Sequence, residues 1–220
     1  MTPLSAGSND DSKGADIETI GLIAGSGWAS GINLYGVGLL LGLFGRFGLA
    51  EVPEILSNPV TIGVFGVLYL VEFVADKIPY LDNVWDAVHT VIRPLGAAAL
   101  GYLLAGDIEG ASQAASAGGS GLLALASHST KATARAAINA SPEPASNIVV
   151  SLLEDGLVAT VVWFALEYPV AALGAVVVLL LAGGVVIVLA FKAARGIFHR
   201  VRARLSGEHS SGCRSRKERR

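Results

Sequence analysis

Charged residues and cysteine are both scarce in this sequence, and each scarcity excludes a class of protein. Only 15% of the 220 residues are charged, whereas 52% are hydrophobic. A soluble domain of this length needs more charged surface, so the composition indicates an integral membrane protein. The single cysteine, Cys213, excludes an intrachain disulfide and a cysteine-based metal cluster.

Basic residues are scarce as well, except at the C-terminal end. Ten of the 16 Lys and Arg residues lie from Lys192 onward, while the rest of the chain carries six bases and 16 acids. The positive-inside rule then predicts that residues 193–220 form a basic cytoplasmic tail. Anionic-lipid or nucleic-acid binding by this tail is the alternative, although we expect no nucleic-acid partner. Residues 1–16 lack a basic n-region, which favours a disordered leader over a signal peptide.

Apolar runs divide the chain into six predicted membrane spans. They cover roughly residues 18–46, 59–77, 92–105, 110–130, 147–167 and 168–191, with an amphipathic interfacial segment at 80–90. The fourth run consists largely of Ala, Ser and Gly, so neighbouring helices should enclose it. The sixth is the cleanest and should face lipid. Six spans and a cytoplasmic tail predict a multi-pass inner (plasma) membrane protein with both termini in the cytoplasm.

Glycine is concentrated in the first of these spans. Small residues allow another helix to approach closely, and close packing is our favoured interpretation of this pattern. The alternative is a break in the helix within the Gly25–Asn33 patch, G-S-G-W-A-S-G-I-N.

One sequence pattern occurs twice. Arg, six residues, Pro-Glu, two residues and Ser-Asn are found at 46–58 and again at 135–147, 89 positions later. We therefore predict an all-α fold of two repeats, residues 17–105 and 106–192. Three spans in each repeat would give the halves opposite orientations, which is the inverted-repeat plan of many transporters.

The predicted topology brings charged side chains from distant segments to a similar depth. A charge at that depth costs about 2.5–3.5 kcal/mol, so it must be paired or line water. The candidate ligands are Glu72, Asp76, Glu154 and Asp155, extended by Asn147 and Ser151. The candidate charge-balancing residues are Lys77, Lys131, Arg135 and Arg46.

Two interpretations of this set remain open. Glu72 or Asp76 could pair with Lys131 or Arg135 as a structural staple between the halves. Alternatively, the four carboxylates could bind a divalent cation or a proton, since hard cations prefer oxygen ligands and carboxylates in a low dielectric hold protons more tightly. The sequence does not specify the metal or any cofactor.

Several stretches resemble a known family of bacterial multi-pass membrane proteins, the domain of unknown function DUF4126. They are G-W-A-S-G-I-N-L (27–34), G-L-F-G-R-F-G (42–48), E-F-V-A-D-K-I-P (72–79) and S-P-E-P-A-S-N-I-V-V-S-L-L-E-D (141–155). The resemblance implies a membrane location but no activity or ligand. The E-x-x-x-D-K segment is also similar to the E-x-G-D-K motif of duplicated cation exchangers, with one extra residue.

These features favour a small-solute transporter or channel, for an inorganic cation and with proton coupling, surrounded by the lipid bilayer. A homo-oligomer is compatible with them. A non-catalytic scaffold held by salt bridges is the first alternative. The sequence lacks the usual hydrolase, metalloprotease, P-loop and dinucleotide motifs, so we do not expect an enzyme. A lipid-modifying enzyme is the second alternative.

Overall fold

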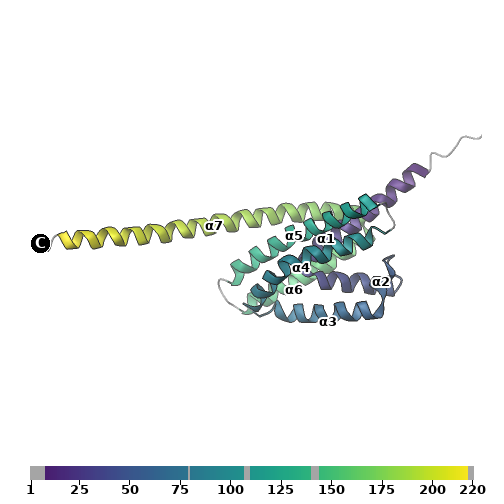
Figure 1. Cartoon of the computed structure of the whole chain (residues 1–220), viewed down its shortest axis with the longest axis horizontal. Helices are drawn as coiled ribbons and strands as arrows, with labels where there is room; N and C mark the ends of the chain where they lie inside the picture. Colours follow the sequence, from purple (N-terminus) through teal and green to yellow (C-terminus); the bar gives the residue numbers. More distant parts are fainter. Residues whose placement is uncertain (1–7, 79, 107–109, 140–143, 218–220) are drawn as a thin grey trace, which may run out of the picture.

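The chain folds as a bundle of α-helices (Figure 1). The computed structural model describes residues 8–78, 80–106, 110–139 and 144–217, and this part of the chain contains helices and turns but no strand. The predicted all-α class is therefore confirmed. The helices are α1 (Ser8–Arg46), α2 (Glu54–Ser57), α3 (Pro59–Ala75), α4 (Leu81–Leu104), α5 (Gly110–Asn139), α6 (Pro144–Glu167) and α7 (Pro169–Lys217).

Several helices have the length and composition of membrane spans. Within the described residues four segments meet both requirements: Ile17–Arg46, Leu81–Leu104, Ala145–Glu167 and Pro169–Gly196. Helix α3 is apolar but shorter. These helices are consistent with the predicted membrane protein, and the predicted number of six spans stays a prediction.

Helix α1 is broken at Asn33, whose φ of −150° and ψ of 95° are not helical. Before the break, Gly25 faces Ala165 of α6. After it, Leu40 lines the same small cavity as Ala159 of α6. The chain thus passes along α6 one way before Asn33 and the other way after it, so the two halves of α1 run in opposite directions (Figure 1).

This reversal changes the expected topology. The break divides the candidate span Ile17–Arg46 into residues 17–32 and 34–46, each shorter than the roughly 20 residues that cross a bilayer core, so this part of α1 has the form of a re-entrant pair. The described start of α1 and the far end of α7 then lie at opposite ends of the bundle (Figure 1). The prediction that both termini lie in the cytoplasm treated α1 as a single span, whereas a re-entrant α1 predicts that the two ends of the chain lie on opposite sides.

Close packing of α1 is also present. A Cβ atom at Gly31 would overlap the Ser127 side chain and the Ala124 carbonyl of α5, and one at Gly27 would overlap Ser120. The favoured interpretation of the glycines is thus confirmed, and the break that was its alternative occurs as well. Helix α1 packs against α3, α4, α5, α6 and α7, which makes it the central element of the bundle.

Helix α4 differs from its prediction as an interfacial segment followed by a short span. It is one continuous helix from Leu81 to Leu104. Its apolar side chains Val84 and Val88 are exposed, whereas its polar face points into the bundle. Lipid is as apolar as a protein core, so in a bilayer the polar side of such a helix is the one that needs protein partners.

Two other expectations are corrected. The first described residues of the predicted leader, 8–16, are helical, and the tail continues α7 as a helix to Lys217 that projects beyond the bundle (Figure 1). The first half of α5 is not enclosed, since Ser112, Ala115 and Gly119 are exposed. Helix α7 is the least buried of the four candidate spans, in line with its predicted lipid-facing role.

Candidate functional site: a buried charge network at the tip of helix α1

Arg93 of α4 is the centre of a network of buried charges. Its guanidinium group donates to Glu72 Oε1 at 2.7 Å, to Asp86 Oδ1 at 3.0 Å and to His128 Nδ1 at 2.7 Å. The Arg93 and Glu72 side chains are completely buried. Arg93 therefore joins α3, α4 and α5 through charge-assisted hydrogen bonds, which are the stronger kind.

Lys131 of α5 lies one layer further along the network. Its amine donates to Asp76 Oδ2 at 2.7 Å and lies 3.6 Å from Glu154 Oε2 and 3.9 Å from Glu72 Oε1. The Lys131 side chain is 1% exposed. This is one of the ion pairs that the staple interpretation predicted, and it links α5 to the end of α3.

Arg135 closes the network near the ends of α3, α4 and α6. It binds Glu154 Oε2 at 2.6 Å and Asn147 Oδ1 at 2.6 Å, and lies 3.8 Å from Asp82 Oδ2. The Asn147 amide donates in turn to the backbone oxygen of Asp76 at 3.0 Å. The second copy of the repeated pattern thus folds so that its Arg and its Asn contact each other.

The break in α1 lies directly on this network. Arg93 donates to the Gly31 carbonyl at 3.3 Å and Lys131 to the Ile32 carbonyl at 3.1 Å, so two cations face the carbonyl end of the first half-helix. Asn33 Oδ1 accepts from Gly36 N at 2.8 Å and caps the second half-helix. Cations at helix C-termini and side-chain oxygens at N-termini are the favoured arrangement, so the network stabilises both ends of the break.

Asp155 is bound differently from the other three predicted carboxylates. Glu72, Asp76 and Glu154 each lie 2.6–2.7 Å from a basic nitrogen. Within the described part of the chain, no basic nitrogen lies within 4.0 Å of Asp155. Its Oδ1 accepts from Asn33 Nδ2 at 3.1 Å, and its buried Oδ2, like Glu72 Oε2 and Asp76 Oδ1, has no hydrogen-bond partner.

The match to a family model covers residues 20–189 and therefore most of the chain; the family is described as a domain of unknown function, DUF4126. The chain belongs to the DUF4126 family. No curated protein and no solved structure matches it. The predicted family is thereby confirmed, and chemical inference about this DUF4126 protein rests on its own residues.

Nine of the ten predicted site residues of the DUF4126 protein lie in or beside the network. Lys77, in the turn between α3 and α4, donates to Ser151 Oγ at 3.3 Å, and burial lowers the pKa of its amine. Arg46 is the exception, because it is exposed at the end of α1. Asn58, in the first copy of the repeated pattern, is exposed too, so only the second copy builds a buried site.

Several residues of the network were not predicted. The most informative are Asp82, Asp86, His89 and Arg93, all buried on one face of α4. Their spacing of four, three and four residues is that of a helix face, and this signal was available in the sequence. It was missed because residues 80–90 were interpreted as lying at the membrane surface. Asn139, which donates to Asp82 Oδ2 at 3.0 Å, was missed as well.

The hydrogen bonds of His128 determine its tautomer. Arg93 can only donate, so His128 Nδ1 must accept and the proton of the neutral ring lies on Nε2. That Nε2 group lies 3.0 Å from Thr90 Oγ1, whose own proton goes to the Asp86 carbonyl at 3.0 Å. His128 therefore cannot act as a base toward Thr90, and this pair does not support the alternative of a lipid-modifying enzyme.

Acids outnumber bases in the network of the DUF4126 protein. Six carboxylates (Glu72, Asp76, Asp82, Asp86, Glu154 and Asp155) surround four bases (Lys77, Arg93, Lys131 and Arg135). Two carboxylates thus lack a matching base. Among the described residues, no group of three or more His, Cys, Asp or Glu side chains is arranged to hold a metal ion.

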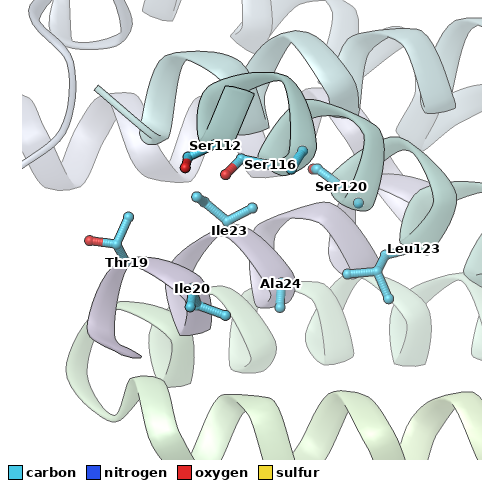
Figure 2. A pocket seen from close by; sticks show the side chains of 10 residues that line it. Thr19, Ile20, Ile23, Ala24, Ser112, Ser116, Ser120 and Leu123 are labelled. Carbon is cyan, nitrogen blue, oxygen red and sulfur yellow. The ribbon is translucent and has the colours of Figure 1, made fainter. Parts of the chain in front are cut away.

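A separate cavity of about 520 Å³ lies between α1 and α5 at the other end of the bundle. Figure 2 shows Ser112, Ser116 and Ser120 along α5 on one wall and Ile20 and Ile23 of α1 on the other. None of its lining residues is charged. The tight contacts of Gly27 and Gly31 with α5 lie between this cavity and the network.

Proposed function

We propose that this protein is a small-solute transporter or channel of the lipid bilayer, for an inorganic cation and coupled to protons. Its transport site is the charge network at the break in α1, where the helix turns back at Asn33. One observation carries the proposal: a central helix is broken at Asn33, and the break faces the buried cations Arg93 and Lys131 and, through the Asn33 side chain, the half-buried Asp155. Many transporters bind their ions at such discontinuous helices near the bilayer midplane.

Two further observations support this function. The excess of two carboxylates over bases leaves the network able to accept positive charge, as a cation or as protons. The serine-lined cavity between α1 and α5 offers an approach from the opposite end of the bundle. In this proposal the close contact of Gly27 and Gly31 with α5, which we call the seam, separates this cavity from the charge network.

The repeated sequence pattern fits the same proposal. Its copies begin at Arg46, where α1 ends, and at Arg135, near the end of α5. We take the two halves to be repeats in which the Arg of the second copy is buried and that of the first is exposed; the reversal of α1 removes the odd number of crossings from which opposite orientations were predicted. The site then lies where the halves meet, since Glu72 and Arg93 come from the first half and Lys131 and Arg135 from the second.

A membrane scaffold is the second candidate function, and the density of ion pairs favours it. Arg93, Lys131 and Arg135 all have carboxylate partners within 3.0 Å. Buried pairs of this kind tie helices together whether or not anything is transported. Asp155 distinguishes the candidates, because it has no such partner and so contributes little to a staple.

Flux measurements on Asp155→Asn test the transporter. The purified protein is reconstituted in liposomes with an internal pH dye, under imposed gradients of Na⁺, K⁺ or Mg²⁺. We expect wild type to move protons or one of these cations, and Asp155→Asn to lose at least about 90% of that flux. Asparagine keeps the shape of the side chain and can still bond to Asn33, so the unfolding free energy should change by less than about 1 kcal/mol.

Glu54→Gln is the matched control, since Glu54 is an exposed carboxylate outside the network. It should transport like wild type. Wild-type liposomes without flux under every gradient would leave the scaffold as the better account. Equal flux in wild type and Asp155→Asn would show that the Asp155 carboxylate takes no part in transport.

A further inference from the structure

Asp155 reaches a small cavity of its own. This cavity of about 150 Å³ lies between the second half of α1, α3 and α6. Its wall consists mainly of apolar side chains, namely Leu39, Leu40, Val158 and Ala159, together with Gly36, Tyr69 and Asp155. It is therefore an apolar cavity with a single carboxyl group in its wall, and we refer to it as the chamber.

The lining of the chamber selects between a metal ion and a proton. Ca²⁺ binds six to eight oxygen ligands, and Mg²⁺ requires six in near-octahedral geometry. The side chains of this chamber offer only the Asp155 carboxylate and the Tyr69 hydroxyl. A proton needs a single oxygen lone pair, and Asp155 Oδ2 is buried without a partner. The chamber thus suits a proton and not a metal ion.

We propose that Asp155 is a proton-binding carboxyl that loads and unloads through this chamber, and that its protonation loosens the tip of α1. This inference rests on the proposed function for its purpose, but the binding step stands on its own. Oδ2 takes a proton from a hydronium ion or water in the chamber and returns it by the same route. No oxidant, metal or other reactant is required.

Protonation reaches α1 through Asn33. The Asn33 amide donates to Asp155 Oδ1, while its own Oδ1 caps the second half-helix. A hydrogen bond to a carboxylate is roughly twice as strong as one to a neutral carboxyl group, so the proton weakens the hold on the cap. The proton signal is thereby converted into a change at the break.

The charged and titratable groups facing Asp155 come from α3, the turn that follows it and α5. The electrostatic neighbours of Asp155 are the cations Lys77, in the turn after α3, and Lys131 of α5, together with the acid Asp76. Tyr69 of α3 shares the chamber with Asp155. Glu154 is adjacent in sequence and forms an ion pair with Arg135 at 2.6 Å.

Labelling with dicyclohexylcarbodiimide tests this assignment. The reagent is apolar and reacts only with protonated carboxyl groups. Labelling therefore shows both that a carboxyl group is protonated and that an apolar molecule can reach it. Purified wild-type protein is treated in detergent micelles over a pH series, and the adduct is mapped by mass spectrometry. We expect one dominant adduct, at Asp155, which rises about tenfold for each unit by which the pH is lowered until it saturates.

Two variants sharpen the test. Ala159→Leu fills the chamber from its exposed side without touching the ion pairs and should cut labelling at Asp155 at least about fivefold. Glu54→Gln, at an exposed carboxylate outside the network, should leave it unchanged. Adducts distributed over Glu72, Asp76 and Glu154, a yield independent of pH, or no adduct at Asp155 would overturn the assignment. Labelling requires no flux, so a protein that labels at Asp155 and transports nothing refutes the proposed function alone.

Discussion

Replacing Arg93 with alanine should destabilise the protein by about 3–5 kcal/mol, the usual cost of stranding a buried charge. Arg93 and Glu72 are completely buried, and the Asp86 side chain is 5% exposed. Removing the guanidinium leaves both carboxylates without their nearest cation and His128 Nδ1 without its donor. It also removes a donor to the Gly31 carbonyl at the break in α1.

Thermal and denaturant unfolding of the detergent-purified variant measure this loss. The control is Arg46→Ala, which removes the same group from an exposed position and should change stability by less than about 0.5 kcal/mol. Arg93→Lys should lie between the two, because one amine cannot reproduce the fork of bonds to Glu72 and Asp86. An Arg93→Ala protein as stable as the control would mean that water reaches the network.

Replacing Gly31 with valine should be the most damaging change in the seam between α1 and α5. A Cβ atom there would overlap the Ala124 backbone carbonyl as well as the Ser127 side chain. A flexible side chain can move away, but a helix backbone cannot, so the helices must separate. Overpacking of this kind costs about 1–3 kcal/mol or more, and the extra methyl groups of valine favour the upper end.

The matched control is Gly118→Ala, in the exposed part of α5, where no atom lies within 4 Å of the added carbon. Removing a helical glycine there should stabilise the protein by about 0.4–1 kcal/mol. Unfolding midpoints of both variants provide the comparison. If the unfolding midpoint of Gly31→Val equals that of wild type, α1 and α5 are further apart than the structure places them.

The sequence could predict that charged side chains from three helices lie close together, because this depends only on the order and length of the helices. Glu72 and Asp76 end one apolar run, Lys131 and Arg135 end another, and Glu154 lies within a third. Alternating helices bring such positions together whatever their detailed packing. The pairing of Lys131 with Asp76 at 2.7 Å followed from the cost of leaving either charge alone.

The sequence allowed a break in the helix near Asn33, but it did not predict that the chain reverses direction there. A long uncharged run has the composition of a single span, and one non-helical residue is enough to turn the chain back. The signals at this position are weak: an asparagine able to cap a helix and glycines on its N-terminal side. What stabilises the turn is tertiary, since Arg93, Lys131 and Asp155 come from three other helices.

Helix α4 shows why the centre of the site was missed. In a soluble protein its face of Leu81, Val84 and Val88 would be the buried one, and the charged face would be solvated. Here the charged face of Asp86 and Arg93 is buried and the apolar face is exposed. For a bundle in lipid, the polar stripe of an amphipathic helix is the better guide to the interior.

The reversal of α1 is the central claim, and labelling at the two ends of the bundle tests it most directly. Cys213→Ser removes the native thiol, and a single cysteine then replaces either Glu18 or Ala194, both exposed. A membrane-impermeant maleimide is applied to sealed right-side-out and inside-out vesicles. The re-entrant α1 predicts that the two positions react in vesicles of opposite orientation. Reaction of both positions in the same orientation would mean that α1 crosses the membrane as one span, and the broken-helix site would be wrong.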